Sequence, residues 1–202
     1  MSNPQAGPEA SVAPKRHRNA TATKEAILQA ALKAFSQSGY DGVGLREIAR
    51  AVGVDPRMVG YYFESKEKLF EAVVDYSMTF PLSVPIMTGD WATRLLTQSQ
   101  APRQADGFLL TLRSTSNPKA VEILRNCVER NYERGLAAEL GGEHPRGRAA
   151  LLIAINMGVL LMREVLGNAA LTSADTRDVI PNLEAAFRAA ASPSPGRPEH
   201  LA

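Results

Sequence analysis

The chain has 202 residues, of which 45% are hydrophobic, and its formal net charge is +2. This length and composition allow one or two domains with hydrophobic cores. Cys127 is the only cysteine, which excludes an intramolecular disulfide and favours a reducing cytoplasm. The longest apolar stretch, Ala149 to Met162, contains Asn156 and is shorter than the ~18 residues that predict a membrane span. We therefore expect a cytoplasmic protein with no membrane contact.

Positive charge is concentrated in the N-terminal third of the chain. Residues 11–68 contain ten Lys/Arg and six Asp/Glu, whereas residues 69–202 contain thirteen and fourteen. Such an asymmetry favours a polyanionic partner for the basic part. A solvated basic face would give the same composition, so charge alone leaves both interpretations open.

The two ends of the chain have the composition of disordered segments. Residues 1–20 contain three prolines and end in the basic run "KRHRN", which predicts a disordered basic arm. Residues 191–202 include "SPSPGRP" and predict a disordered tail. Between them, apolar residues recur at helical spacing and strand alternation is absent, so we expect an all-α fold.

The first predicted helix runs from Thr23 to Ser38. Its apolar residues recur at spacings of three and four, and Gly39 ends it. Further along, Ser65 caps the helix of "SKEKLFEAVVDYSM". This helix is the only obvious rigid connection between the N-terminal and C-terminal parts of the chain.

The stretch "LREIARAVGVDPRMVGYYF", Leu45 to Phe63, contains two short helices joined by a glycine. A steep crossing of two helices needs a small side chain at the contact and a residue that tolerates positive φ in the turn. Ala49 and Gly53 provide these, four residues apart. The inward-facing side chains are Ile48, Val52, Val54 and Val59. The combination predicts a helix-turn-helix.

The second helix of this pair is expected to be exposed to solvent along one side. Asp55 can cap its start, with Pro56 at the first helical position. Two adjacent tyrosines and Gly60 are unusual packing residues on a short helix, but they suit a DNA groove, where hydroxyls can bond phosphate oxygens. The alternative is that Tyr61 and Tyr62 complete the core.

The segment "TKEAILQAALKAFSQSGYDGVGLREIARAVGVDPRMVGYYFESKEKLFEAVV" resembles the DNA-binding domain of the tetracycline-repressor (TetR) family of bacterial transcriptional regulators. The resemblance covers roughly residues 20–75. It implies that Asp55–Phe63 enters the major groove, with Arg57, Met58 and Tyr61 facing bases and with Tyr62 and Lys66 holding phosphates. The residues that it implies at the DNA interface are Gly44, Leu45, Arg46, Arg57, Met58, Gly60, Tyr61, Tyr62 and Lys66.

Two positions depart from the family pattern. Gly44 occurs where the family commonly has a threonine that caps the helix and bonds a phosphate. Gly60 replaces a frequent phosphate-binding tyrosine. The first departure removes the side chain for that phosphate contact, and the second leaves more of the DNA contact to Tyr61 and Tyr62.

The domain organisation follows from these elements. We expect a disordered arm at 1–20, a three-helix helix-turn-helix domain at 21–68, a larger helical effector-binding and dimerisation domain at 69–190, and a disordered tail at 191–202. The helices expected in the larger domain are Trp91 to Ser99, Gly107 to Leu112, Pro118 to Leu140, Arg146 to Leu166 and Ala174 to Ala190. Their expected caps are Asp106, Asn117 and Ser173.

One short helix reads too few base pairs to compete with a genome's excess of sites, so we expect a homodimer on a pseudo-palindromic operator. A helix that is apolar on nearly all sides, such as Ala149–Met162, needs neighbours all round. It predicts either a four-helix seam between subunits or a core helix within one subunit. The residues predicted at the seam are Leu152, Val159, Leu160, Leu183 and Phe187.

The expected effector is an unidentified small molecule. Its cavity would be lined by Trp91, Phe108, Tyr132, Met157 and Met162, with Asn156 or Arg163 as the polar anchor. For each of these residues taken alone, ordinary core packing is the more common role. Cys127 is expected to be a small buried hydrophobe rather than a redox sensor.

The sequence does not favour an enzyme. His17, His144 and His200 lie in a tail, a loop and a tail, which does not suit a catalytic or metal cluster. We expect no metal and no cofactor. The preferred function is a transcriptional repressor that its effector releases from DNA. An effector-independent DNA-binding protein and an effector-assisted regulator are the alternatives.

Overall fold

The computed structural model describes residues 13–78, 90–98, 101–172 and 176–193. Every regular element within these ranges is helical, in agreement with the predicted all-α fold. The N-terminal helices are α1 (Ala13–Ser38), α2 (Leu45–Val52), α3 (Pro56–Phe63) and α4 (Lys66–Ser77). They are followed by α6 (Trp91–Thr97), α7 (Pro102–Ser114), α8 (Pro118–Val128), the π-helical η1 (Glu129–Glu133), α9 (Arg134–Leu140), α10 (Pro145–Leu160), the π-helical η2 (Leu161–Val165), the short η3 (Ala169–Leu171) and α11 (Thr176–Ala191).

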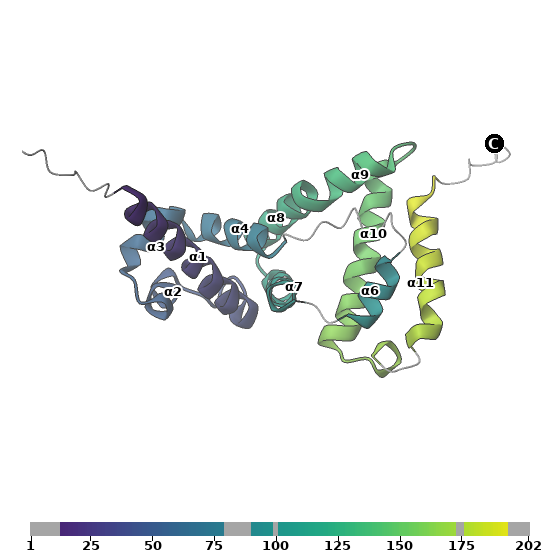
Figure 1. The fold of residues 1–202 in the computed structure, drawn as a ribbon, viewed down its shortest axis with the longest axis horizontal. Helices are drawn as coiled ribbons and strands as arrows, with labels where there is room; N and C mark the ends of the chain where they lie inside the picture. Colours follow the sequence, from purple (N-terminus) through teal and green to yellow (C-terminus); the bar gives the residue numbers. More distant parts are fainter. Residues whose placement is uncertain (1–12, 79–89, 99–100, 173–175, 194–202) are drawn as a thin grey trace, which may run out of the picture.

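The helices form an elongated molecule (Figure 1). Helices α1, α2 and α3 occupy one end, α6, α10 and α11 occupy the other, and α7 and α8 lie between them. Helix α4 leads from the first group toward α8. The middle helices are therefore placed to pass a displacement from one end to the other.

Helix α1 begins ten residues earlier than predicted, at Ala13. The predicted disordered arm is therefore wrong from residue 13 onward, while residues 1–12 lie outside the described ranges. A proline at the second position is compatible with a first helical turn, and the alanine, lysine and arginine residues that follow are good helix formers. At the other end Ser38 is the last residue, as predicted, and Gly39 follows with φ +69°.

The predicted helix-turn-helix is present. Gly53 adopts φ 76° and its N–H bonds to the carbonyls at the end of α2. Asp55 Oδ1 accepts a hydrogen bond of 2.7 Å from the Arg57 N–H, so it caps α3 as expected. Ile48 and Val59 are buried and lock the two helices against α1. The local signals of this segment were sufficient to place both helices.

The later helices match the prediction except for α7. Asp106 was predicted to cap a helix at Gly107, but it lies inside α7, which begins at Pro102. A proline at the first position starts a helix well, and Gly107 is tolerated inside it because it packs closely against α4. The run from Pro118 to Leu140 is continuous through α8, η1 and α9, with Asn117 Oδ1 capping its start as predicted. Ser173 lies outside the described residues.

Two hydrophobic cores hold the chain together. The first contains residues of α1 to α4 and also Leu110, Leu124 and Cys127 from α7 and α8. The second contains α6, α9, α10 and α11, together with Phe108 of α7. The predicted boundary at 68/69 falls inside α4, and the predicted tail begins at Ala191, which still belongs to α11. Helix α7 contributes to both cores.

Candidate DNA interface and ligand cavity

Helix α3 presents a polar and aromatic surface to solvent. Arg57, Met58 and Tyr61 are exposed, and the exposed fraction of Tyr61 reaches 79%. Tyr62 is half-buried, and its ring lies edge-on to that of Tyr61 with centroids 5.4 Å apart. A Cβ added at Gly60 would meet no atom within 4 Å, so this position leaves room for a close approach from outside. The alternative that both tyrosines complete the core is therefore wrong for Tyr61.

The residues around α3 that were predicted to contact DNA lie at the starts of α2 and α4. Gly44 is exposed and has no side chain to cap α2, so the first N–H groups of that helix are left for another acceptor. Arg46 is exposed, whereas Leu45 packs partly against the first core. Lys66 Nζ lies 4.6 Å from the ring centroid of Tyr40, a cation–π contact that fixes the lysine stem at the start of α4.

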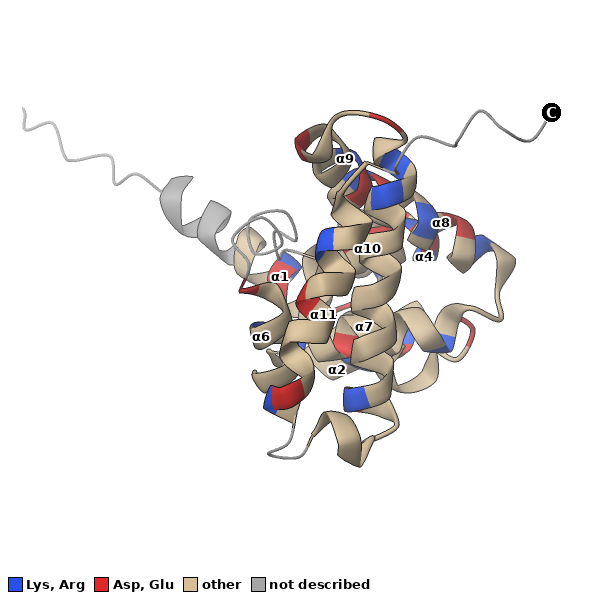
Figure 2. Cartoon of the chain, turned by 90° about the vertical axis from the view of Figure 1, so that its right-hand side faces the viewer, with Lys and Arg blue, Asp and Glu red and all other residues tan. Residues whose placement is uncertain are grey.

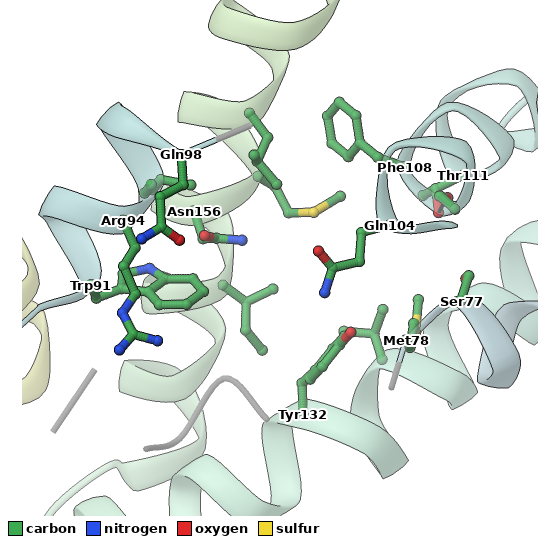
Figure 3. A pocket seen from close by; sticks show the side chains of 16 residues that line it. Ser77, Met78, Trp91, Arg94, Gln98, Gln104, Phe108, Thr111, Tyr132 and Asn156 are labelled. Carbon is green, nitrogen blue, oxygen red and sulfur yellow. Dashed lines mark hydrogen bonds between the residues drawn. The ribbon is translucent and has the colours of Figure 1, made fainter. Parts of the chain in front are cut away.

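A cavity of about 210 Å³ lies between α4, α6, α7, η1 and α10. Figure 3 shows its walls: Trp91, Gln98 and Asn156 on one side face Gln104 and Phe108 of α7 on the other. Its described lining residues are Ser77, Met78, Trp91, Arg94, Leu95, Gln98, Gln104, Gly107, Phe108, Thr111, Val128, Tyr132, Ile153, Asn156, Met157 and Leu160. Five of the seven residues predicted for an effector, namely Trp91, Phe108, Tyr132, Asn156 and Met157, are brought together here.

Several polar groups of the cavity have no partner in the described part of the chain. Asn156 is only 7% exposed, and its Oδ1 makes no hydrogen bond. Burial raises the pKa of Tyr132 to about 12, so its hydroxyl keeps its proton. Arg94 is the one charged residue among the described lining residues, and no ion pair involves it there. Sequence reasoning missed Arg94 and Gln98, although both share the helical face of Trp91.

Met162 and Arg163 do not belong to the cavity, which corrects the prediction. Met162 is 36% exposed on η2. The Arg163 guanidinium instead donates to the backbone oxygens of Leu95 and Gln98 and so holds the end of α6. Both residues lie in η2, a π-helical segment with i→i+5 hydrogen bonds that follows α10.

Three of the predicted seam residues lie inside one subunit. Leu152 is fully buried, and Leu160 and Phe187 are 8% and 5% exposed, all in the second core. Val159 and Leu183 are half-buried against the same core. The periodicity of α10 could not separate its two faces because both are apolar. The opposite side of this helical segment is exposed to solvent. Its exposed residues are Leu151, Ala154 and Gly158 of α10, Met162 and Val165 of η2, and Leu166.

The cavity and the N-terminal helices are joined through α7. A Cβ at Gly107 would lie 2.5 Å from Ser77 Cβ, so α7 and α4 approach each other at the cavity wall. A Cβ at Gly39 would lie 2.4 Å from the Arg113 carbonyl oxygen, so the far end of α7 also touches the end of α1. The Arg113 guanidinium donates to the Ser36 carbonyl oxygen at this contact.

Other candidate chemistry receives no support from the geometry. Cys127 is fully buried in the first core, and this burial raises the pKa of its thiol to about 12, which suits a packing residue rather than a redox sensor. Across the described ranges, no group of three or more His, Cys, Asp or Glu is arranged to hold a metal ion. None of the described helices has the length and apolar character needed to cross a membrane.

Two family models match the chain, one over the N-terminal helices and one over the C-terminal helices. The model of "Bacterial regulatory proteins, tetR family" matches residues 27–73, which include the helix-turn-helix. The model of the "Tetracyclin repressor-like, C-terminal domain" matches residues 89–190, half of the chain, including most of the cavity lining and nearly all of α11. The protein belongs to the TetR family of bacterial transcriptional regulators.

Curated TetR-family relatives match over a shorter span. The HTH-type transcriptional regulator RutR of Escherichia coli (strain K12) is 50% identical over 60 residues, which are 30% of this chain and 28% of RutR. The HTH-type transcriptional repressor NicS of Pseudomonas putida is 41% identical over 61 residues, 30% of this chain and 29% of NicS. The matched part is thus less than a third of each relative.

Solved structures of TetR-family and related regulators share the fold. NalD of Pseudomonas aeruginosa, the secondary repressor of the MexAB-OprM multidrug efflux pump, has a TM-score of 0.59 at 21% identity, covering 85% of this chain and 96% of NalD. A transcriptional regulator of Rhodococcus sp. Rha1 has a TM-score of 0.55 at 25% identity, covering 83% of this chain and 93% of that chain. These likenesses confirm the helical architecture.

Proposed function

We propose that this TetR-family protein is a cytoplasmic, homodimeric repressor that leaves its operator when a small molecule enters the cavity. The observation that carries the proposal is the position of α7. Its residue Phe108 lines the cavity, while Leu110, two residues later, packs in the core of the DNA-binding helices. A ligand that displaces α7 would therefore act on α1 through contacts that already exist.

At the operator, α3 lies in the major groove. Arg57, Met58 and Tyr61 reach base edges, since they are exposed on the side of α3 opposite the core. Tyr62 and Lys66 hold phosphates, and the uncapped start of α2 at Gly44 offers backbone N–H groups to a further phosphate. Gly60 allows the groove wall to approach the helix backbone.

The dimer seam forms on the outer side of α10 and α11. Leu151 and Leu166 are 51% and 63% exposed, and small residues such as Ala154 and Gly158 lie exposed between them. Figure 2 faces this side of the molecule, where α10 carries no charged residue after Arg148. Val159 and Leu183 border the seam. The two α3 helices of the dimer would lie about 34–36 Å apart, one turn of B-DNA.

The roles of several relatives support repression. NicS is described as a repressor, NalD as a secondary repressor, and IcaR of Staphylococcus aureus (strain Newman), 37% identical over 51 residues, as a negative transcriptional regulator. The proposed repressor needs neither an enzyme activity nor a cofactor.

The ligand can release the dimer from its operator only if it binds the DNA-incompetent conformation more tightly than the competent one. A ligand shifts an equilibrium only by the difference between its affinities for the two conformations. Moving the dimer from mostly DNA-competent to mostly incompetent needs about 5.5 kcal/mol of such preference. By linkage, operator DNA must weaken ligand binding by the same factor by which the ligand weakens DNA binding.

The test starts with the operator. Selection from random duplexes with the purified full-length protein should enrich a pseudo-palindrome, and titration against it should show a steep dependence on salt. Metabolites are then screened for release of the labelled operator, and calorimetry of any hit is run with and without the duplex. Weaker ligand binding on DNA supports release. Tighter binding would make the protein an effector-assisted regulator. A cavity that no screened compound enters, on a protein that still binds its operator, would favour the effector-independent alternative.

A further inference from the structure

We propose that the cavity binds a small aromatic carboxylic acid of one or two rings, whose carboxylate pairs with Arg94 and whose ring carries a hydrogen-bond donor for Asn156. The inference names the ligand class of the effector site and therefore rests on the proposed function. Three features of the cavity support it: the charge of the wall, the polar groups that lack partners, and the size and shape of the space.

The charge of the cavity wall favours an anion. Arg94 is charged, and the described lining residues include no Asp or Glu. The sequence has no acidic residue from Tyr76 to Gly89, and Asp90 at the start of α6 forms no ion pair with Arg94. A guanidinium offers a planar fork of N–H donors that matches a carboxylate. Arg94 is exposed at the cavity wall and pairs with no carboxylate among the described residues, so its guanidinium is available to a ligand.

Uncharged hydrogen-bond donors on the other walls also favour a negatively charged ligand. The Tyr132 hydroxyl, Gln104 and Gln98 line the cavity, and their side chains make no hydrogen bond within the described ranges. Hydroxyl and carboxamide groups can donate to a carboxylate oxygen but carry no charge that would repel it. Figure 3 shows Gln98 and Asn156 on one side and Gln104 on the other, directed toward the same space.

Asn156 requires a partner that the protein does not supply. It is 7% exposed, and its Oδ1 has no hydrogen bond, although buried carboxamide oxygens are nearly always paired. A ring hydroxyl or ring N–H of the ligand would donate to this oxygen. Asn156 therefore favours a ligand that carries a hydrogen-bond donor at the end away from its carboxylate.

The remaining wall favours a flat, apolar body. Trp91, Phe108 and Met157 enclose the space, and aromatic rings pack well against aromatic and thioether groups. The volume of about 210 Å³ lies below the range of about 300–1,000 Å³ found for drug-sized ligands, which favours a body of one or two rings.

The test uses matched probes on two scaffolds, benzene and naphthalene. Each scaffold is offered as the hydroxy-carboxylate (4-hydroxybenzoate, 6-hydroxy-2-naphthoate), the corresponding neutral hydroxy-carboxamide, and the methoxy-carboxylate, which lacks the donor. Trp91 is the chain's single tryptophan, so one indole N–H cross-peak in the ¹H–¹⁵N spectrum of the full-length protein reports binding in the cavity. Titration of this peak gives Kd without any DNA.

We expect at least one hydroxy-carboxylate to shift the Trp91 peak and to bind at least tenfold more tightly than its carboxamide and its methoxy analogue. Arg94→Gln should remove the preference for the acid while leaving carboxamide binding unchanged, and Asn156→Leu should remove the preference for the hydroxyl. Arg125→Gln, an exposed arginine on α8 away from the cavity, is the matched control and should change neither.

Equal binding of acids and carboxamides, preference for the carboxamide, or a Trp91 peak that no acid moves would overturn the inference. So would an equal loss of acid and carboxamide binding in Arg94→Gln. The proposed function is judged separately by adding operator duplex. Acids that bind as expected but never release DNA would leave the ligand class standing and remove the release mechanism. Neutral compounds that release DNA would do the reverse.

Discussion

Ser36 Oγ in α1 lies 3.0 Å from Asp106 Oδ1 in α7, across 70 positions of sequence, and shares its one hydroxyl proton between this carboxylate and the Lys33 carbonyl oxygen at 2.9 Å. Asp106 directly precedes Gly107 and Phe108, which line the cavity, and Ser36 lies in the last turn of the first DNA-binding helix. Ser36 is 2% exposed, so this bond joins the cavity wall to the DNA-binding helices at a place that water hardly reaches.

We expect Ser36→Ala to weaken the coupling between ligand and operator. The variant removes one connection between α7 and α1 and should cost about 0.5–1.5 kcal/mol of stability, as a typical hydrogen bond does. The coupling free energy should fall by about 0.5–2 kcal/mol, the range found for residues that contact neither ligand. Operator titrations with and without the identified ligand measure it. Unchanged coupling would show that the switch does not use this contact.

Gly107→Ala should separate α7 from α4. Its added methyl group would lie 2.5 Å from Ser77 Cβ, and forcing extra atoms into a packed contact costs about 1–3 kcal/mol. Urea denaturation measures the loss, and Ser77→Gly in the same chain should recover part of it. Gly135→Ala in α9 is the control, because a Cβ there meets nothing within 4 Å and should stabilise the helix by about 0.5–1 kcal/mol. Equal stability of the two alanine variants would contradict the contact.

Arg57 and Lys66 should differ in how they affect DNA binding. Arg57→Ala is expected to cost about 1–3 kcal/mol on the selected operator and little on random duplex, because a base contact carries sequence information. Lys66→Ala should weaken all duplexes alike and reduce the salt slope by about one unit. Fluorescence anisotropy on both duplexes at several salt concentrations distinguishes the two roles. The same sequence-independent loss in both variants would remove Arg57 from base reading.

Two adjacent leucines of α10 test the seam. Leu151 is 51% exposed, whereas Leu152 is fully buried. Leu151→Glu should give a folded monomer with weak operator binding, since the charge enters only the dimer contact. Leu152→Glu should instead unfold the subunit, as should Leu160→Glu and Phe187→Glu, because they place a charge in the second core. Light scattering and circular dichroism separate the two outcomes. A folded, dimeric Leu151→Glu protein would place the seam elsewhere.

The thiol of Cys127 should be inert in the native protein. Burial raises its pKa from 9.0 to about 12, so the thiolate is scarce at pH 8 and the sulfur is also inaccessible. Between these two pH values the unfolded chain has lost the proton that the folded chain keeps, and the free energy of unfolding must therefore fall as pH rises from 9 toward 12. Ellman's reagent at pH 8 should react only after urea is added. Rapid labelling of folded protein would indicate an open first core.

Features set within one or two turns of chain could be predicted from the sequence. Asp55 and Asn117 cap their helices and Gly53 takes positive φ, because a cap or a turn depends on the few residues that contain it. The same locality made the exposed face of α3 predictable, since its buried side is fixed by Val59 and Phe63.

The roles of residues in α10, η2 and α7 were decided only by the tertiary structure. Leu160 and Leu151 are chemically alike, yet one lines the cavity and the other meets solvent, because α6 and α11 pack on one side of α10 and leave the other open. Arg163, in the π-helical η2, donates to the Leu95 carbonyl oxygen of α6, 68 positions earlier in the chain. The connection through α7 depends on Gly107 meeting Ser77 and on Asp106 meeting Ser36. Such contacts join residues far apart in the chain, and no local pattern specifies which distant element will fill the space beside a helix.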